Sequence, residues 1–150
     1  MYKLIVAISV LLFNAPVGDL NNDVMVKKVN EFRNEGCTCG GEKMSPVKSI
    51  IWNKKLYSSA FSHADDMKRY KYFSHFSRSG QDVGERVDRF DYKWTVIGEN
   101  IAEGQKNFDE ALEDWIKSPS HCKMIMDPNV TEMGVARSGR YWVQHFGKQR

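Results

Sequence analysis

The chain has 150 residues, of which 41% are hydrophobic and 12% aromatic, so it carries enough apolar side chains to close the core of one domain. This composition excludes a largely disordered chain. The formal net charge is only +3, and lysines and arginines are not gathered into a long run, which argues against nucleic acid as a partner.

The N-terminus has the pattern of an export signal. A short basic flank, residues 1–3, precedes an almost wholly apolar stretch over residues 4–13, which is too short to span a bilayer. We therefore predict a signal peptide or N-terminal hydrophobic segment over residues 1–18 and one domain over residues 22–150. An uncleaved membrane anchor is the alternative, and the signal interpretation predicts a secreted or extracytoplasmic protein.

The first part of the domain is predicted to be a helix followed by a loop. Apolar residues recur at near-helical spacing over residues 24–34, and Asn22 or Asp23 can cap that helix. Residues 37–49 are rich in glycine, serine and proline, so this segment is expected to be irregular.

A longer helix is predicted over residues 53–70, with one apolar face on which His63 is expected to be a buried core residue. An irregular loop follows over residues 71–80. Asp82 can then cap a short helix, because Glu85 stands three residues later, as a capping box requires.

The second half of the domain alternates strands and helices. Residues 94–102 are predicted to form a strand that pauses at the polar triplet of residues 98–100. Asn107 or Asp109 starts the next helix, and the Ser-Pro-Ser-His run of residues 118–121 starts a further helical turn.

Two closing strands are predicted over residues 132–138 and 141–146, joined by a tight hairpin at residues 139–140. Helices placed before, between and after a few strands favour an antiparallel sheet covered by helices over a parallel sheet. The predicted fold class is therefore α+β.

Three cysteines, Cys37, Cys39 and Cys122, are present. In an exported chain they predict one long-range disulfide to Cys122 from either Cys37 or Cys39, with one thiol left over. We take Cys39 with Cys122 as the working pair and leave the choice open. Zinc binding by these three is less favoured, because a Cys-x-Cys spacing is tighter than zinc sites usually have.

Three dispersed polar residues, His75, Glu99 and His121, are the candidates for chemistry. Two neutral imidazoles and one carboxylate could bind a divalent metal, with the carboxylate as third ligand or as a group that orients a histidine. Without a metal they would form a hydrogen-bonded network. Spacing alone leaves open that they are two ordinary surface histidines and an unrelated carboxylate.

The ordered motifs resemble the CAP superfamily, also called SCP-like, which includes cysteine-rich secretory proteins, antigen 5 and plant pathogenesis-related proteins, with many bacterial secreted members. The matches run in family order over almost the whole domain. They are Leu56, Ala60, His63-Ala64-Asp65-Asp66-Met67, Ser74-His75, Gly84-Glu85-Arg86, Gly98-Glu99-Asn100-Ile101-Ala102, Trp115, Ser118-Pro119-Ser120-His121, Met133-Gly134-Val135 and Tyr141-Trp142-Val143-Gln144.

The resemblance implies an α-β-α sandwich, with a central antiparallel sheet between helical layers. It also implies a cleft formed by His75, Glu99 and His121, in which the two histidines would be the metal ligands. The family's second acidic residue would fall at Ser118, so strong divalent binding is weakened and a bacterial-type member is expected.

The predicted function is a non-enzymatic, exported binding or interaction module whose cleft binds zinc or another divalent metal, with no other cofactor. Its partner would be a protein or a lipid, and the chain is expected to be a monomer. The alternatives are a metal-dependent hydrolase or peptidase, and a sterol or fatty-acid carrier. No His-Glu-x-x-His or Gly-x-Ser-x-Gly motif is present, which argues against the hydrolase.

Overall fold

The computed structural model describes residues 21–150, so the predicted signal peptide lies outside the described residues. Five helices and six strands make up this part of the chain. In chain order they are α1 (Asn22–Glu35), β1 (Cys37–Cys39), β2 (Glu42–Met44), β3 (Ile51–Trp52), α2 (Lys54–Tyr70), α3 (Val83–Asp88), β4 (Trp94–Glu103), α4 (Phe108–Lys117), α5 (Pro119–Ile125), β5 (Glu132–Ser138) and β6 (Tyr141–Gln149).

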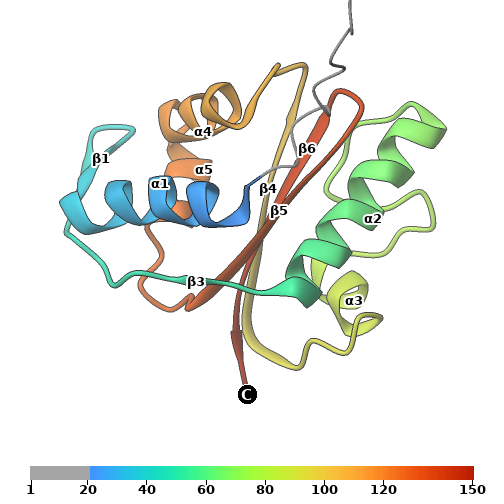
Figure 1. Ribbon diagram of the computed structural model, residues 1–150, viewed down its shortest axis with the longest axis horizontal. Coiled ribbons are helices and arrows are strands. Elements are labelled where there is room, and N and C mark those ends of the chain that lie inside the picture. Colours follow the sequence, from blue (N-terminus) through green and yellow to red (C-terminus); the bar gives the residue numbers. More distant parts are fainter. Residues whose placement is uncertain (1–20) are drawn as a thin grey trace, which may run out of the picture.

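The main sheet lies between two helical layers. Its strand order is β3-β5-β6-β4, in which β5 with β6 and β6 with β4 are antiparallel. Helices α1, α4 and α5 cover one face, and α2 and α3 cover the other (Figure 1). The predicted α+β class and α-β-α sandwich are confirmed.

Side-chain caps start most of the helices. Asn53 and Asn107 accept hydrogen bonds from the first-turn amides of α2 and α4, and Asp82 with Glu85 forms the predicted capping box of α3. The cap of α1 is Asn21, so the expected cap at Asn22 or Asp23 was wrong by one or two positions. None of the helices within residues 21–150 is long and apolar enough to cross a membrane.

Two expectations about strands need correction, and one strand was not predicted. The segment expected to be an irregular loop contains the β1–β2 hairpin, because the two glycines at residues 40–41 adopt positive φ and turn the chain. Strand β4 does not pause at its polar triplet, since β6 pairs with it continuously over residues 96–103. Strand β3 adds a two-residue parallel edge beside β5.

Apolar side chains fill both faces of the sheet. Trp115 and Trp142 are fully buried in the larger cluster beneath α1, α4 and α5, and Ala60 and Val143 belong to a smaller cluster beneath α2. Helix α2 packs very closely on β5, because a Cβ at Gly134 would lie 2.2 Å from the amide nitrogen of Tyr57. The polar side chains of β4 therefore extend from a sheet that is packed on both faces.

Candidate functional site

The polar triplet of β4 sends neighbouring side chains to opposite faces of the sheet. Glu99 pairs with His145 of β6, and Asn100 pairs with Gln144. Because side chains alternate along a strand, Glu99 and His145 share the face covered by α2 and α3, whereas Asn100 and Gln144 share the face covered by α5. The site is thus built around both sides of one strand.

Glu99 is the centre of a charged cluster. Its Oε1 accepts a hydrogen bond from Nδ1 of His75 at 2.8 Å. Its Oε2 accepts one from Nε2 of His145 at 2.8 Å and one from Nη2 of Arg86 at 2.5 Å. Only 3% of the Glu99 side chain is exposed, so this carboxylate is held by protein donors rather than by solvent.

The surroundings of Glu99 stabilise its charged form. Burial by itself would raise the pKa of this carboxyl, but the hydrogen bonds from His145 and His75 and the positive charge of Arg86 outweigh burial. The pKa of Glu99 is therefore held well below its usual range. Glu99 is an ionised anchor at every pH near neutrality.

Arg86 also fixes the loop that carries His75. Its Nη1 donates to the backbone oxygens of His75 at 2.8 Å and Gln81 at 2.7 Å, which are two points of the segment between α2 and α3. His63 supports the same loop from α2, through a 2.9 Å hydrogen bond between Nε2 and the backbone oxygen of Ser74. His63 is 1% exposed, which confirms it as a core histidine.

His75 is the member of the charged cluster that meets solvent. Its side chain is 53% exposed, whereas that of His145 is fully buried. Since Nδ1 of His75 is bound to Glu99, Nε2 is the ring nitrogen left for an external ligand. A carboxylate that holds one nitrogen of an imidazole fixes its tautomer and makes the other nitrogen a better ligand.

His121 lies at the start of α5, and its backbone is tied to the opposite face of β4. Nδ2 of Asn100 donates to the backbone oxygen of His121 at 3.3 Å and to Oε1 of Gln144 at 3.2 Å. Gly98 makes room for this helix, because a Cβ there would lie 2.1 Å from Sδ of Met124. The triplet thus sets the position of α5 as well as that of Glu99.

The His121 ring is half-buried, and burial, followed by the positive charge of His75, lowers its pKa. Within residues 21–150 no hydrogen bond joins the His121 side chain to His75 or Glu99. The structure therefore joins His75 and Glu99 by direct contact, whereas the His121 side chain makes no hydrogen bond to either of them.

Two functional residues, Arg86 and His145, were not among the candidates from sequence. Arg86 belonged to a matching Gly-Glu-Arg motif without an assigned role, and His145 directly follows the last matched motif, which ends at Gln144. The signal for His145 is its pairing with Glu99, which depends on the register between β4 and β6. The register between β4 and β6, which are more than forty positions apart in the sequence, cannot be predicted from either strand alone.

A disulfide joins Cys39 to Cys122, and Cys37 keeps a free thiol. The working assignment is confirmed. The bond links β1 to the residue directly after His121, so it pins the start of α5 from outside while Asn100 holds it from the sheet.

The side chains that could bind a metal are spaced differently in the two polar clusters of the domain. In the described part of the chain, the one group of three potential ligand side chains whose ligand atoms all lie within 4.8 Å of one another is Cys37, Cys39 and Cys122. The ligand atoms of His75, Glu99 and His121 are therefore more widely spread. Both oxygens of Glu99 already accept protein hydrogen bonds, so it fits a role behind a metal-bound histidine better than a role as a ligand.

Comparison with known proteins gives the family. The model of the cysteine-rich secretory protein family, CAP, matches residues 26–146. YkwD of Bacillus subtilis, an uncharacterized protein, is 35% identical over 102 residues, which cover 67% of this chain and 40% of that protein. The membrane protein YlbC of the same organism is 32% identical over 103 residues, which cover 69% of this chain and 30% of that protein. The chain thus spans less than half the length of these relatives.

Solved structures share the fold. An extracellular protein containing an SCP domain from Bacillus anthracis superposes with a TM-score of 0.71 at 23% identity, covering 85% of this chain and 41% of that one. An outer surface protein of Borrelia burgdorferi superposes with a TM-score of 0.73 at 17% identity, covering 85% of this chain and 92% of that one. At these identities the likeness concerns the fold alone.

Proposed function

The chain belongs to the cysteine-rich secretory protein family, CAP, and from this premise we propose that it is an exported, non-enzymatic binding module. In this proposal His75 and His121 offer nitrogen ligands to a divalent metal, with zinc as the first candidate, and Glu99 orients His75 from behind. The extracellular and outer-surface relatives of the same fold support export.

One observation carries the choice of binding over catalysis. A hydrolytic mechanism would need Glu99 to take a proton from water, but Arg86, His145 and His75 all donate to this carboxylate, and its pKa is held well below the usual range. A carboxylate stabilised in this way is a weak base. The same contacts orient His75, whose exposed ring is suited to binding.

The metal is tested by zinc titration calorimetry in a Cys37→Ser background, because the free thiol is itself a zinc ligand. We expect His75→Ala and His121→Ala each to weaken zinc binding at least about tenfold, since each removes one of two protein nitrogens. Glu103→Gln is the control, because this carboxylate of β4 pairs with Arg140 outside the charged cluster. If all the variants bind zinc alike, the metal site is wrong.

The enzymatic alternative is tested separately. A generic peptidase assay of the purified domain, with and without chelator, should show no turnover above background. Turnover that Glu99→Gln abolishes would overturn the choice of binding over catalysis.

Lipid carriage is a second candidate, favoured by a groove of about 560 Å³ between α2 and the segment that includes α3. Aromatic side chains line it, among them Phe61 and Tyr70, but Asp66 and Arg89 line it as well. The groove therefore suits an amphipathic molecule better than a wholly apolar one. Native mass spectrometry of the purified protein would reveal a retained lipid, and a Phe61→Ser variant should then lose it.

A further inference from the structure

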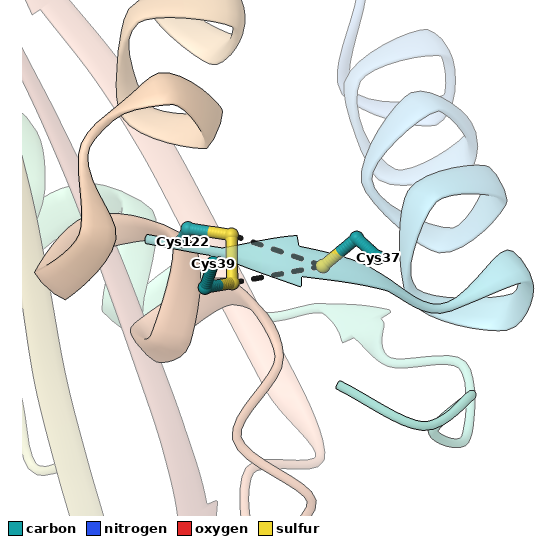
Figure 2. A group of neighbouring side chains, drawn as sticks. All are labelled: Cys37, Cys39 and Cys122. Carbon is teal, nitrogen blue, oxygen red and sulfur yellow. Dashed lines mark hydrogen bonds between the residues drawn. A yellow bond between two sulfur atoms is a disulfide. The ribbon is translucent and has the colours of Figure 1, made fainter. Parts of the chain in front are cut away.

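Three sulfur atoms gather where the β1–β2 hairpin meets α5 (Figure 2). Sγ of Cys37 lies 3.6 Å from Sγ of Cys39 and 3.8 Å from Sγ of Cys122, beside the disulfide that joins those two residues. Cys37 and Cys39 stand two positions apart in β1, so their side chains share one face of the strand. Both cysteines of the hairpin are therefore aimed at Cys122.

The three cysteines differ in access to solvent. Cys39 is 1% exposed and Cys122 is fully buried, whereas Cys37 is partly exposed. An external thiol or oxidant therefore reaches Cys37 before it reaches the disulfide. The disulfide is in turn reached from inside the protein, by the thiol of Cys37.

We propose that Cys37 exchanges with Cys39 as the disulfide partner of Cys122, so that either cysteine of the hairpin can hold the start of α5. The Cys37 thiolate attacks Sγ of Cys122, and a Cys37–Cys122 bond forms as the Cys39–Cys122 bond breaks. Cys39 leaves as a thiolate and takes up one proton, which balances the proton that Cys37 lost. The number of disulfides is unchanged, so the step needs no external oxidant or reductant.

The strand geometry selects this route over the formation of a Cys37–Cys39 disulfide. Residues two apart in a strand have Cα atoms about 6.6 Å apart, near the upper limit for a disulfide. By contrast, Cys37 and Cys122 come from different elements, and their Sγ atoms already lie 3.8 Å apart. Attack at Cys122 also keeps the hairpin linked to α5, whereas attack at Cys39 would release that helix.

Two features make the exchange slow. The nearly equal sulfur distances place the thiol beside the disulfide rather than on its extension, so Cys37 must rotate before it can attack in line. Burial also raises the pKa of the Cys37 thiol, which lowers the thiolate fraction at neutral pH. The exchange is therefore slow at neutral pH and becomes faster at alkaline pH, where more of the Cys37 thiol is ionised.

The exchange bears on the site because Cys122 directly follows His121. A bond from Cys37 keeps Cys122 attached to the hairpin. The attachment point then moves from Cys39 to Cys37, which is the more exposed end of β1. The inference concerns the cysteines alone, so it stands whether or not His121 binds a metal.

The wild-type protein provides the main test. After incubation at alkaline pH, the exchange is quenched with acid, the free thiol is alkylated, and the denatured protein is cleaved with trypsin. Residues 34–43 hold both hairpin cysteines and residues 118–123 hold Cys122, so fragmentation of the linked peptide pair identifies the alkylated cysteine. We expect label on Cys39 in a fraction of molecules that grows with incubation. Label confined to Cys37, or label on Cys122, would overturn the proposal.

Single variants sharpen the result. Cys39→Ser, refolded with oxidised glutathione, should form a Cys37–Cys122 disulfide and leave no thiol to alkylate. Cys37→Ser is the matched control and should keep the Cys39–Cys122 bond with no label at all. If folded Cys39→Ser carries alkylatable thiols at both Cys37 and Cys122, the proposal is wrong, and if this variant does not fold, the wild-type labelling decides.

Discussion

The two faces of β4 are held by different kinds of polar contact, although the residues concerned are neighbours. On one face, Glu99 forms a charged cluster with Arg86 and His145, and this cluster reaches solvent through a half-exposed histidine. On the other face, Asn100 and Gln144 form a neutral, fully buried amide pair that holds the backbone of α5.

The difference separates two roles within one sequence triplet. A buried charge needs its partners, because an uncompensated ion in a protein interior is costly, whereas a buried amide loses only hydrogen bonds. The charged face is made of ionisable side chains, and the amide pair contains none. The charged face is therefore suited to binding and the amide face to holding the helix.

The largest expected effect comes from removing the central charge. Glu99→Gln leaves the Arg86 guanidinium buried without a counter-ion, so we expect a loss of about 3–5 kcal/mol in the free energy of unfolding, measured with urea. Glu103→Gln is the control, since this residue lies on the same strand and its ion-pair partner, Arg140, is largely exposed. It should cost under about 1 kcal/mol. Equal losses would show that the cluster does not depend on the charge.

The fold of this protein was easier to predict from its sequence than the charged cluster around Glu99. Capping residues and periodicity are local signals, so the helix starting after Asn53 and the capping box at Asp82 were predicted closely. Glu99 and His75 were named as candidates from their polar segments, and the family motifs then supported that choice. The contact between Glu99 and His145 was not, because it depends on the register of two distant strands.

The hairpin over residues 37–44 was missed for a related reason. Its composition indicates a turn-rich segment. Each strand of the hairpin has only three residues, and it is a strand because β1 and β2 pair with each other. The choice between Cys37 and Cys39 also depended on that pairing, since both cysteines face the same direction. Local propensity could therefore predict neither the hairpin nor the disulfide partner of Cys122.

The charged face should also make stability depend on pH through His63, which lies on α2 beneath the loop of His75. Burial lowers the pKa of His63 from 6.5 to about 4. The unfolded chain therefore binds a proton between pH 6.5 and about 4 that the folded protein does not, so stability falls as the pH falls through this window. The contribution is about 3 kcal/mol between neutrality and pH 4.

His63→Gln removes this titration. Urea unfolding followed by tryptophan fluorescence should show a shallower loss of stability between neutral and acid pH in the variant than in the wild type. Glu99 remains ionised through most of that window because its pKa is held low, so it serves as a constant background. Parallel pH profiles for the two proteins would contradict the assignment to His63.

On the amide face, Asn100→Ala should cost about 1–3 kcal/mol, because Gln144 loses its buried partner and the backbone oxygen of His121 loses a donor. This loss should be the same at acid and neutral pH, unlike that of the charged face. Hydrogen exchange of the α5 amides should also become faster. A pH-dependent loss would mean that the two faces are coupled through β4.

The smallest effect on stability is expected at the exposed end of the charged face. His75→Ala removes one of the three donors to Glu99, but Arg86 and His145 remain and water can replace the lost imidazole, so the free energy of unfolding should fall by under about 1 kcal/mol. His145→Ala removes a donor from the same carboxylate at a fully buried position, where water cannot enter without a cavity, and should cost clearly more. Loss of zinc binding in His75→Ala with nearly unchanged unfolding would place the binding role at the exposed histidine and the structural role at the buried one. Equal destabilisation by the two variants would mean that exposure does not separate those roles.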